Sequence, residues 1–169
     1  IAKACKLTRE QVDYKLKKYL ATGLIRGFIT FYDWQKFGYN YLAVLLLRFE
    51  KSDSIDKFTL KLEKSKHCIS YGQVFGKYDL FINCIFKDEK EISDYIAGLI
   101  SDSHDSVSSY FLMKPYFTEL YPLKIFKSEN RENYTYTSEL TKEKKFDKKE
   151  IAIMKILAKN SRAKLIDIA

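Results

Sequence analysis

The chain has 169 residues, of which 46% are hydrophobic and 15% aromatic, which is enough apolar material for one medium domain or two small ones. No apolar run is long enough to span a bilayer, because the run Leu42 to Leu47 has only the length of a strand, and no signal peptide is evident. The three cysteines lie far apart without CxxC spacing, which argues against a disulfide framework or a zinc site, so we expect a cytoplasmic, non-membrane protein.

The net charge of +8 is concentrated at the two ends of the chain. Residues 1–28 contain 7 Lys and Arg against 2 Asp and Glu, and residues 124–169 contain 12 against 7. Residues 40–123 contain 10 against 12, and are therefore slightly acidic. Basic flanks around an acidic middle indicate that the flanks meet a polyanion while the middle has another task.

Residues 7–23 have the pattern of one helix with a marked start and end. Thr8 and Gln11 have the spacing of a capping box, and Gly23 follows the last turn, where a left-handed residue is favoured. The predicted inner face consists of apolar residues at helical spacing: Val12, Leu16, Tyr19 and Leu20.

The outer face of this helix is basic and rich in hydrogen-bonding groups, as in a helix that lies in a DNA major groove. The residues suited to phosphates are Thr8, Lys15, Lys17, Lys18 and Arg26; those suited to base edges are Arg9 and Gln11, and Tyr14 suits base contact or packing. Glu10 and Asp13 could accept from cytosine amino groups or form salt bridges with neighbouring lysines. The alternative is an ordinary amphipathic helix with a solvated charged face.

The segments on either side complete part of a winged helix-turn-helix. Ile1 to Lys6 resembles the end of a preceding helix, and Ile25 to Phe31 the first strand of a wing. We therefore predict a partial winged helix-turn-helix over residues 1–36, with its first helix missing.

Residues 37–124 have the order strand, helix, strand, strand, helix, strand. The predicted strands are Tyr41–Phe49, Ile69–Val74, Leu80–Phe86 and Val107–Phe117, and the predicted helices are capped at Asp53 or Ser54 and at Asp88. This order is the ferredoxin-like βαββαβ arrangement, in which both helices cover one face of an antiparallel sheet.

The other face of that sheet is predicted to be apolar and uncovered. Because Leu42 to Leu47 and the face of Phe81, Asn83 and Ile85 are mostly apolar, a second copy of the chain is expected to cover them. A charge placed at Leu45 is expected to break that assembly.

Residues 125–145 are polar and resemble a linker, and a new helical pattern begins at Phe146 with a capping pair, Asp147 and Glu150. We assign residues 146–169 to the start of a second helix-turn-helix. The fold class is therefore α+β: a partial winged helix-turn-helix, a ferredoxin-like domain and a second partial helix-turn-helix. This order suggests a tandem protein or a window from a longer chain.

These residues resemble the Lrp/AsnC family of prokaryotic transcription regulators over nearly the whole chain. The stretch Val12 to Phe28 is similar to that family's recognition helix and wing, Phe37-Gly38 to its link, and Phe146 to Ala169 to the start of its DNA-binding unit. The turn Phe75-Gly76-Lys77-Tyr78-Asp79 matches its Gly-x-Tyr-Asp turn. The resemblance implies double-stranded DNA, a second copy of the chain and a small effector such as an amino acid as partners, and no cofactor.

The turn at Gly76, Lys77, Tyr78 and Asp79 is the predicted effector site. Gly76 allows a tight turn, Asp79 could meet an ammonium group and Lys77 a carboxylate. The alternative is a hairpin turn in which Asp79 accepts hydrogen bonds from backbone N–H groups.

Two other functions compete with a DNA-binding regulator. Some proteins resembling this family are tetrapyrrole decarboxylases that use histidine, but His67 and His104 share no motif and are expected to be packing or surface residues, so we do not expect an enzyme. A metabolite-sensing interaction module without DNA binding is the other alternative, and the salt dependence of DNA affinity separates it from a regulator.

Overall fold

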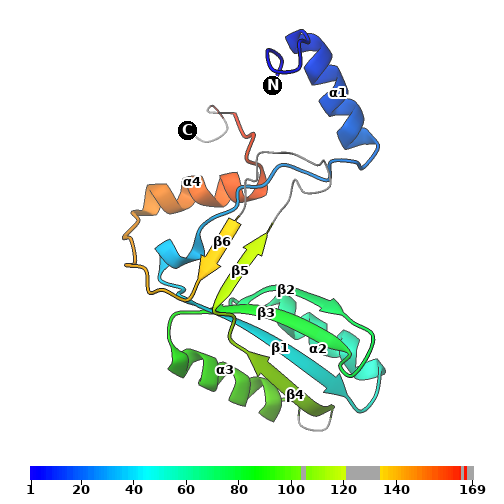
Figure 1. Cartoon of the computed structure of the whole chain (residues 1–169), viewed down its shortest axis with the longest axis vertical. Coiled ribbons are helices and arrows are strands. Elements are labelled where there is room, and N and C mark those ends of the chain that lie inside the picture. Colours follow the sequence, from blue (N-terminus) through cyan, green and yellow to red (C-terminus); the bar gives the residue numbers. More distant parts are fainter. Residues whose placement is uncertain (104–105, 121–133, 165, 167–169) are drawn as a thin grey trace. The chain divides into compact units, whose positions relative to one another are not determined.

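The computed structural model describes residues 1–103, 106–120, 134–164 and 166 (Figure 1). His104, residues 121–133 of the predicted linker segment, and the predicted family match at Ile168 and Ala169 lie outside the described residues. The chain divides into two units: residues 33–144 form one, and residues 1–32 together with residues 145–169 form the other.

Strand β1 (Tyr41–Phe49) lies inside a four-stranded antiparallel sheet of order β2-β3-β1-β4 (Figure 1). Its partners are β3 (Leu80–Phe86) and β4 (Val107–Met113), and β2 (Cys68–Gln73) is the outer neighbour of β3. Apolar side chains on both faces explain why β1 is an interior strand. The prediction of a ferredoxin-like antiparallel sheet is confirmed.

Helices α2 (Asp53–Glu63) and α3 (Glu89–Ser101) both contribute to the core on one face of this sheet. Phe58 of α2 and Ile92 of α3 pack in the same cluster as Leu47 and Leu80, which are fully buried. Each such side chain contributes about 1.5–3 kcal/mol by its burial. The sequence predicted Asp53 or Ser54 as the N-cap residue of α2. The N-cap residue is Ser52, and its side chain makes no capping hydrogen bond.

Alternation along β1 corrects one sequence-based expectation. Leu45 is only 2% exposed and belongs to the core under the helices, opposite Ile82 of β3. Because neighbouring residues of a strand point to opposite faces, the other face carries Val44 and Leu46. The prediction that a charge at Leu45 tests the uncovered face was therefore wrong, and Leu46 is the residue that does so.

Cys84 lies in the core and is 2% exposed, and burial raises the pKa of its thiol to about 12. Since the thiolate is the reactive form, a thiol reagent at pH 8 should label exposed Cys5 and leave Cys84 unmodified until urea unfolds the chain. The raised pKa favours the folded state below pH 9, and this contribution should be lost as the pH rises toward 12. Peptide mass mapping after labelling checks the prediction; rapid labelling of Cys84 in the native chain would contradict it.

The predicted strand Val107–Phe117 is divided. Strand β4 ends at Met113, and after Pro115, which has no N–H to donate, a new strand β5 (Phe117–Leu120) begins. It pairs with β6 (Tyr134–Thr137), which lies within the predicted linker segment. The hydroxyl of Tyr136 donates to the Asn40 carbonyl at 3.1 Å and accepts from the Leu42 N–H at 3.0 Å, so this two-stranded sheet is tied to the start of β1.

A short 3₁₀ helix, η1 (Trp34–Phe37), precedes β1 and ends at Phe37-Gly38, the residues that resemble the family's link. It ends at Gly38, whose φ of 84° is in the left-handed region that favours glycine. The buried Gln35 side chain donates to the carbonyls of Thr137 and Glu139, both at 3.0 Å. The helix therefore packs on the segment that follows β6.

The second unit contains α1 (Arg9–Ala21), an extended segment at residues 28–32, and α4 (Lys148–Lys159). Helix α4 begins at the predicted capping pair, since Asp147 and Glu150 form a capping box. Ile1 to Lys6 contains turns rather than a helix, and the predicted wing strand at Ile25 to Phe31 takes part in no ladder among the described residues. In the described part of the chain, no helix has the length and apolar character needed to cross a membrane.

Candidate functional site

The start of α1 is fixed by the predicted capping box. The Thr8 hydroxyl accepts from the Gln11 N–H at 3.2 Å, and the Gln11 side-chain oxygen accepts from the Thr8 N–H at 2.9 Å. This reciprocal pair leaves the amide NH₂ of Gln11 as a donor for other groups. The pKa of Glu10 is lowered, first by its own backbone N–H and then by the Thr8 hydroxyl.

The predicted DNA-contact residues lie on α1 or just beyond its ends. These residues are all exposed: Thr8, Arg9, Gln11, Tyr14, Lys15, Lys17, Lys18 and Arg26. Tyr14 is 70% exposed, so its ring does not serve as a packing residue within the chain. Among the described residues, no salt bridge joins Glu10 or Asp13 to a neighbouring lysine.

The two units differ strongly in net charge. The unit of residues 1–32 and 145–169 contains 14 Lys and Arg against 5 Asp and Glu, a net charge of +9. Residues 33–144 contain 16 against 17, a net charge of −1. Residues 1–28, with a net charge of +5, and residues 145–169, with a net charge of +4, therefore belong to one unit, whose field attracts polyanions.

The predicted inner face of α1 is less covered than the sequence suggested. No residue of α1 is buried: Val12, Leu16 and Tyr19 are half-buried, and Leu20 is 42% exposed. The helix is held at its C-terminal end, where the Ile25 N–H donates to the Tyr19 carbonyl at 3.0 Å.

The predicted effector turn is a tight connection between β2 and β3. Gly76 has a φ of 127°, and the Lys77 ammonium lies 5.5 Å from the centre of the Tyr78 ring. Asp79 accepts from the Phe49 N–H at 2.8 Å through its carboxylate and donates its own N–H to the Leu47 carbonyl at 2.8 Å. Asp79 thus bonds backbone N–H as in the alternative left open by the sequence, and it ties the turn to β1.

A pocket of about 410 Å³ lies beside this turn. Its lining combines carboxylates with polar and apolar groups: Ser52, Asp53, Ile55, Asp56, Gln73, Val74, Phe75 and Asp79. Of the four predicted effector residues, Asp79 is in this lining, whereas Gly76, Lys77 and Tyr78 are not. Sequence reasoning missed Asp53 and Asp56, which it could have found as the acidic first turn of the helix that follows β1.

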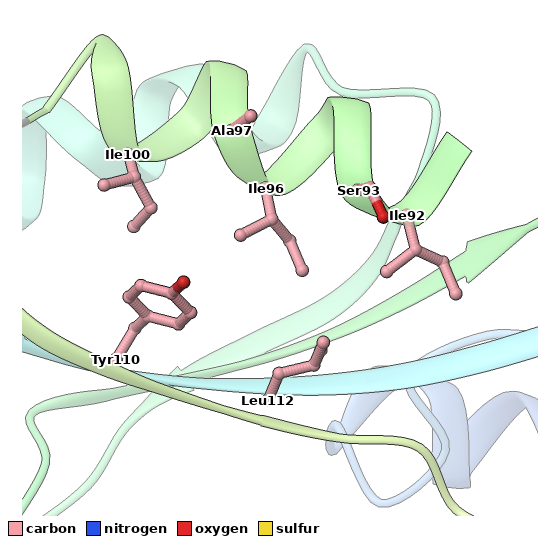
Figure 2. A pocket seen from close by; sticks show the side chains of 7 residues that line it. All are labelled: Ile92, Ser93, Ile96, Ala97, Ile100, Tyr110 and Leu112. Atoms are coloured by element: carbon pink, nitrogen blue, oxygen red, sulfur yellow. The ribbon is translucent and has the colours of Figure 1, made fainter. Parts of the chain in front are cut away.

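A second pocket, also about 410 Å³, lies between α3 and β4 (Figure 2). Figure 2 shows Ile92, Ile96 and Ile100 of α3 pointing toward Tyr110 and Leu112 of β4. The walls offer few polar groups that could orient a ligand, namely the hydroxyls of Ser93 and Tyr110. This pocket is therefore a weaker candidate for an effector than the one beside Asp79.

The sheet face opposite the helices carries an apolar patch, which we call the open face. It consists of half-buried and exposed side chains on three adjacent strands: Val44 and Leu46 of β1, Phe81 of β3, and Phe111 and Met113 of β4. Gly72 of β2 lies against Phe81, since a Cβ there would approach its ring to 2.6 Å. Beyond this patch, Tyr136 covers Leu42 and Ile85, so part of the predicted uncovered face is covered within the chain.

His67 is a packing residue. Its ring is 6% exposed and stacks on Phe86 with centroids 4.8 Å apart, while Nδ1 lies 3.0 Å from the Ile85 carbonyl oxygen. Its Nε2 is 3.6 Å from Glu91. A histidine enclosed in this way is not presented to a large tetrapyrrole.

Comparison with known proteins supports the fold. No family model matches the chain. A curated relative from Pyrococcus abyssi, described as an uncharacterized HTH-type transcriptional regulator, is 23% identical over 101 residues, covering 60% of this chain and 68% of the relative. Solved structures include a transcriptional regulator of Neisseria meningitidis in complex with L-Met, with a TM-score of 0.62 and 16% identity over 68% of this chain and 74% of that one.

The AsnC structure from E. coli gives a TM-score of 0.60, with 17% identity over 68% of this chain and 76% of that one. The Pyrococcus relative and the Neisseria protein are described as transcriptional regulators, in agreement with the expectation that the chain is not an enzyme. The chain therefore has the fold of the Lrp/AsnC regulators, as its resemblance to that family predicted.

Proposed function

We propose that the chain is a DNA-binding transcription regulator in which the outer face of α1 lies in the major groove. The observation that carries this proposal is the unit of net charge +9, on which a capped helix projects Lys15, Lys17 and Lys18 into solvent. The HTH-type name of the Pyrococcus relative supports it. A chain that bound only a metabolite and a partner protein would not require such a concentration of positive charge.

Base preference tests the role of Gln11 independently of helix stability. Replacing Gln11 with glutamate keeps an acceptor for the Thr8 N–H but removes the NH₂ donor that pairs with adenine. We expect α1 to stay helical while discrimination at the contacted base changes by about 1–3 kcal/mol, with cytosine favoured. Selection from a randomised DNA library measures this preference, and identical selected sequences for Gln11→Glu and the parent would remove Gln11 from the interface.

The proposed regulator assembles as a dimer through the open face. An apolar patch on three adjacent strands suits the corresponding patch of a second copy, because a two-fold axis brings the same surface of each subunit together. Tyr136 already covers one end of the sheet, so the proposed contact is limited to the strip from Val44 to Phe111.

The proposed effector is an amino acid bound in the pocket beside Asp79. Asp53 and Asp56 provide carboxylates for an ammonium group, and Ile55, Val74 and Phe75 provide apolar surface for a side chain. The Neisseria regulator was solved with L-Met, which is a ligand of this chemical class.

Calorimetry with a panel of amino acids tests the effector pocket. The variant Asp56→Asn should bind any amino-acid effector at least about 10-fold more weakly, since it removes one charge-assisted contact. Asp94→Asn on α3 is the matched control because Asp94 is not among the residues that line the pocket. Equal affinity in both variants would place the effector elsewhere.

A further inference from the structure

The extended segment at residues 28–32 packs along the C-terminal half of α4, although more than 120 residues separate them in the chain. The Thr30 hydroxyl donates to the Leu157 carbonyl and the Tyr32 hydroxyl to the Met154 carbonyl, both at 3.0 Å. Phe28, Thr30 and Tyr32 are partly buried, whereas Ile29 and Phe31 between them are exposed. The segment therefore presents alternate side chains, with one side toward α4.

The same segment completes the end of α4. In a continuing helix the Ser161 N–H would donate to the Leu157 carbonyl, but here it donates to the Phe28 carbonyl at 2.9 Å. The Leu157 carbonyl receives the Thr30 hydroxyl instead. The Arg162 guanidinium lies 3.9 Å from the centre of the Phe28 ring, which adds a cation–π contact. Residues 28–30 thus act as the C-terminal cap of a helix from the other end of the chain.

We infer that the DNA-binding unit is composite: α4 docks on residues 28–32 of its own chain and thereby positions α1. The segment 28–32 follows directly from α1 through the turn at Thr22 to Gly27, so fixing it fixes the C-terminal end of the recognition helix. Docking also brings together two basic segments, an arrangement that a polyanion stabilises. The positioning role, but not the docking, rests on the proposed function.

The test removes two hydroxyl donors without changing side-chain shape. The variant Thr30→Val with Tyr32→Phe loses both bonds to α4, and the control Thr59→Val with Tyr71→Phe loses two hydroxyl donors within residues 33–144. A free helix of this length is marginal in water, so docking should govern its amide hydrogen exchange. Exchange of the α4 amides in the full chain should be about 30-fold faster in the first variant than in the parent or the control.

Hydrogen exchange tests whether α4 docks on residues 28–32, and DNA affinity tests whether this docking positions α1. Unchanged exchange in the variant, or protection of α4 that disappears on dilution, would overturn docking within one chain. If exchange is faster, DNA affinity about 5-fold below that of the control supports the positioning role, and unchanged affinity overturns it. A parent chain that binds no DNA would refute the proposed function, and with it the positioning role, while the exchange measurement would still decide the docking.

Discussion

Replacing Lys15, Lys17 and Lys18 together with glutamine should weaken DNA binding roughly 100- to 500-fold at 0.1 M salt. Each lysine that neutralises a phosphate releases counterions, and each lost contact lowers the slope of log affinity against log salt by about 0.9. The slope should therefore fall by about 3 for every DNA sequence tested. All three side chains are exposed on α1 and belong to no buried cluster of the described residues, so the fold should be retained.

A matched control replaces Lys57, Lys61 and Lys64 with glutamine. These lysines lie on or next to α2, in the unit of net charge −1, and their removal changes the total charge by the same amount. Fluorescence anisotropy over a salt series measures both variants. Equal slopes for the two triple variants would mean that the phosphate contacts lie outside α1.

Replacing Leu46 with aspartate should convert the proposed dimer into a folded monomer. Leu46 lies in the open face between Phe81 and Phe111, so an assembled dimer would bury the new charge without a partner. Burying an unpaired charge costs several kcal/mol, which corresponds to a loss of dimer affinity of about 1,000-fold or more. Light scattering over a range of concentrations measures the change in mass.

Two further variants serve as controls for Leu46→Asp. Leu45→Asp places the same charge in the core, where its cost approaches the whole free energy of unfolding of a small domain, so this chain should not fold. Leu60→Asp places it on the exposed surface of α2, where Leu60 is 58% exposed, and should change neither mass nor circular dichroism. If the parent chain has the mass of a monomer, the proposed dimer is wrong and a second copy does not cover the open face.

The sequence predicted the elements of the sheet well because their patterns are strong. β1 and β3 have the predicted bounds, Tyr41–Phe49 and Leu80–Phe86, and both capping boxes are present. The assignment of Leu45 to the open face failed for a physical reason: β1 is apolar on both sides, so its composition does not distinguish its two faces. Only the register with Ile82 and the packing of the helices do so.

The candidate sites were less predictable because they depend on contacts between distant residues. The motif containing Asp79 was recognised, but its bond to the Phe49 N–H joins residues 30 positions apart. The predicted wing strand at Ile25 to Phe31 belongs to no sheet among the described residues, and the hydroxyl of Thr30 instead donates to a helix 127 residues away. No local pattern specifies such a partner.

The contact between Thr30 and Leu157 also sets an order of events during protein synthesis. Residues 28–32 leave the ribosome before their helical partner, which follows after 127 residues, a delay of roughly 6–25 s at ordinary elongation rates. The intervening antiparallel sheet can form in that interval from its own segments. A nascent chain would therefore hold a folded antiparallel sheet before α4 is available to complete the unit that contains α1, and the proposed DNA-binding surface would be incomplete until α4 has been made.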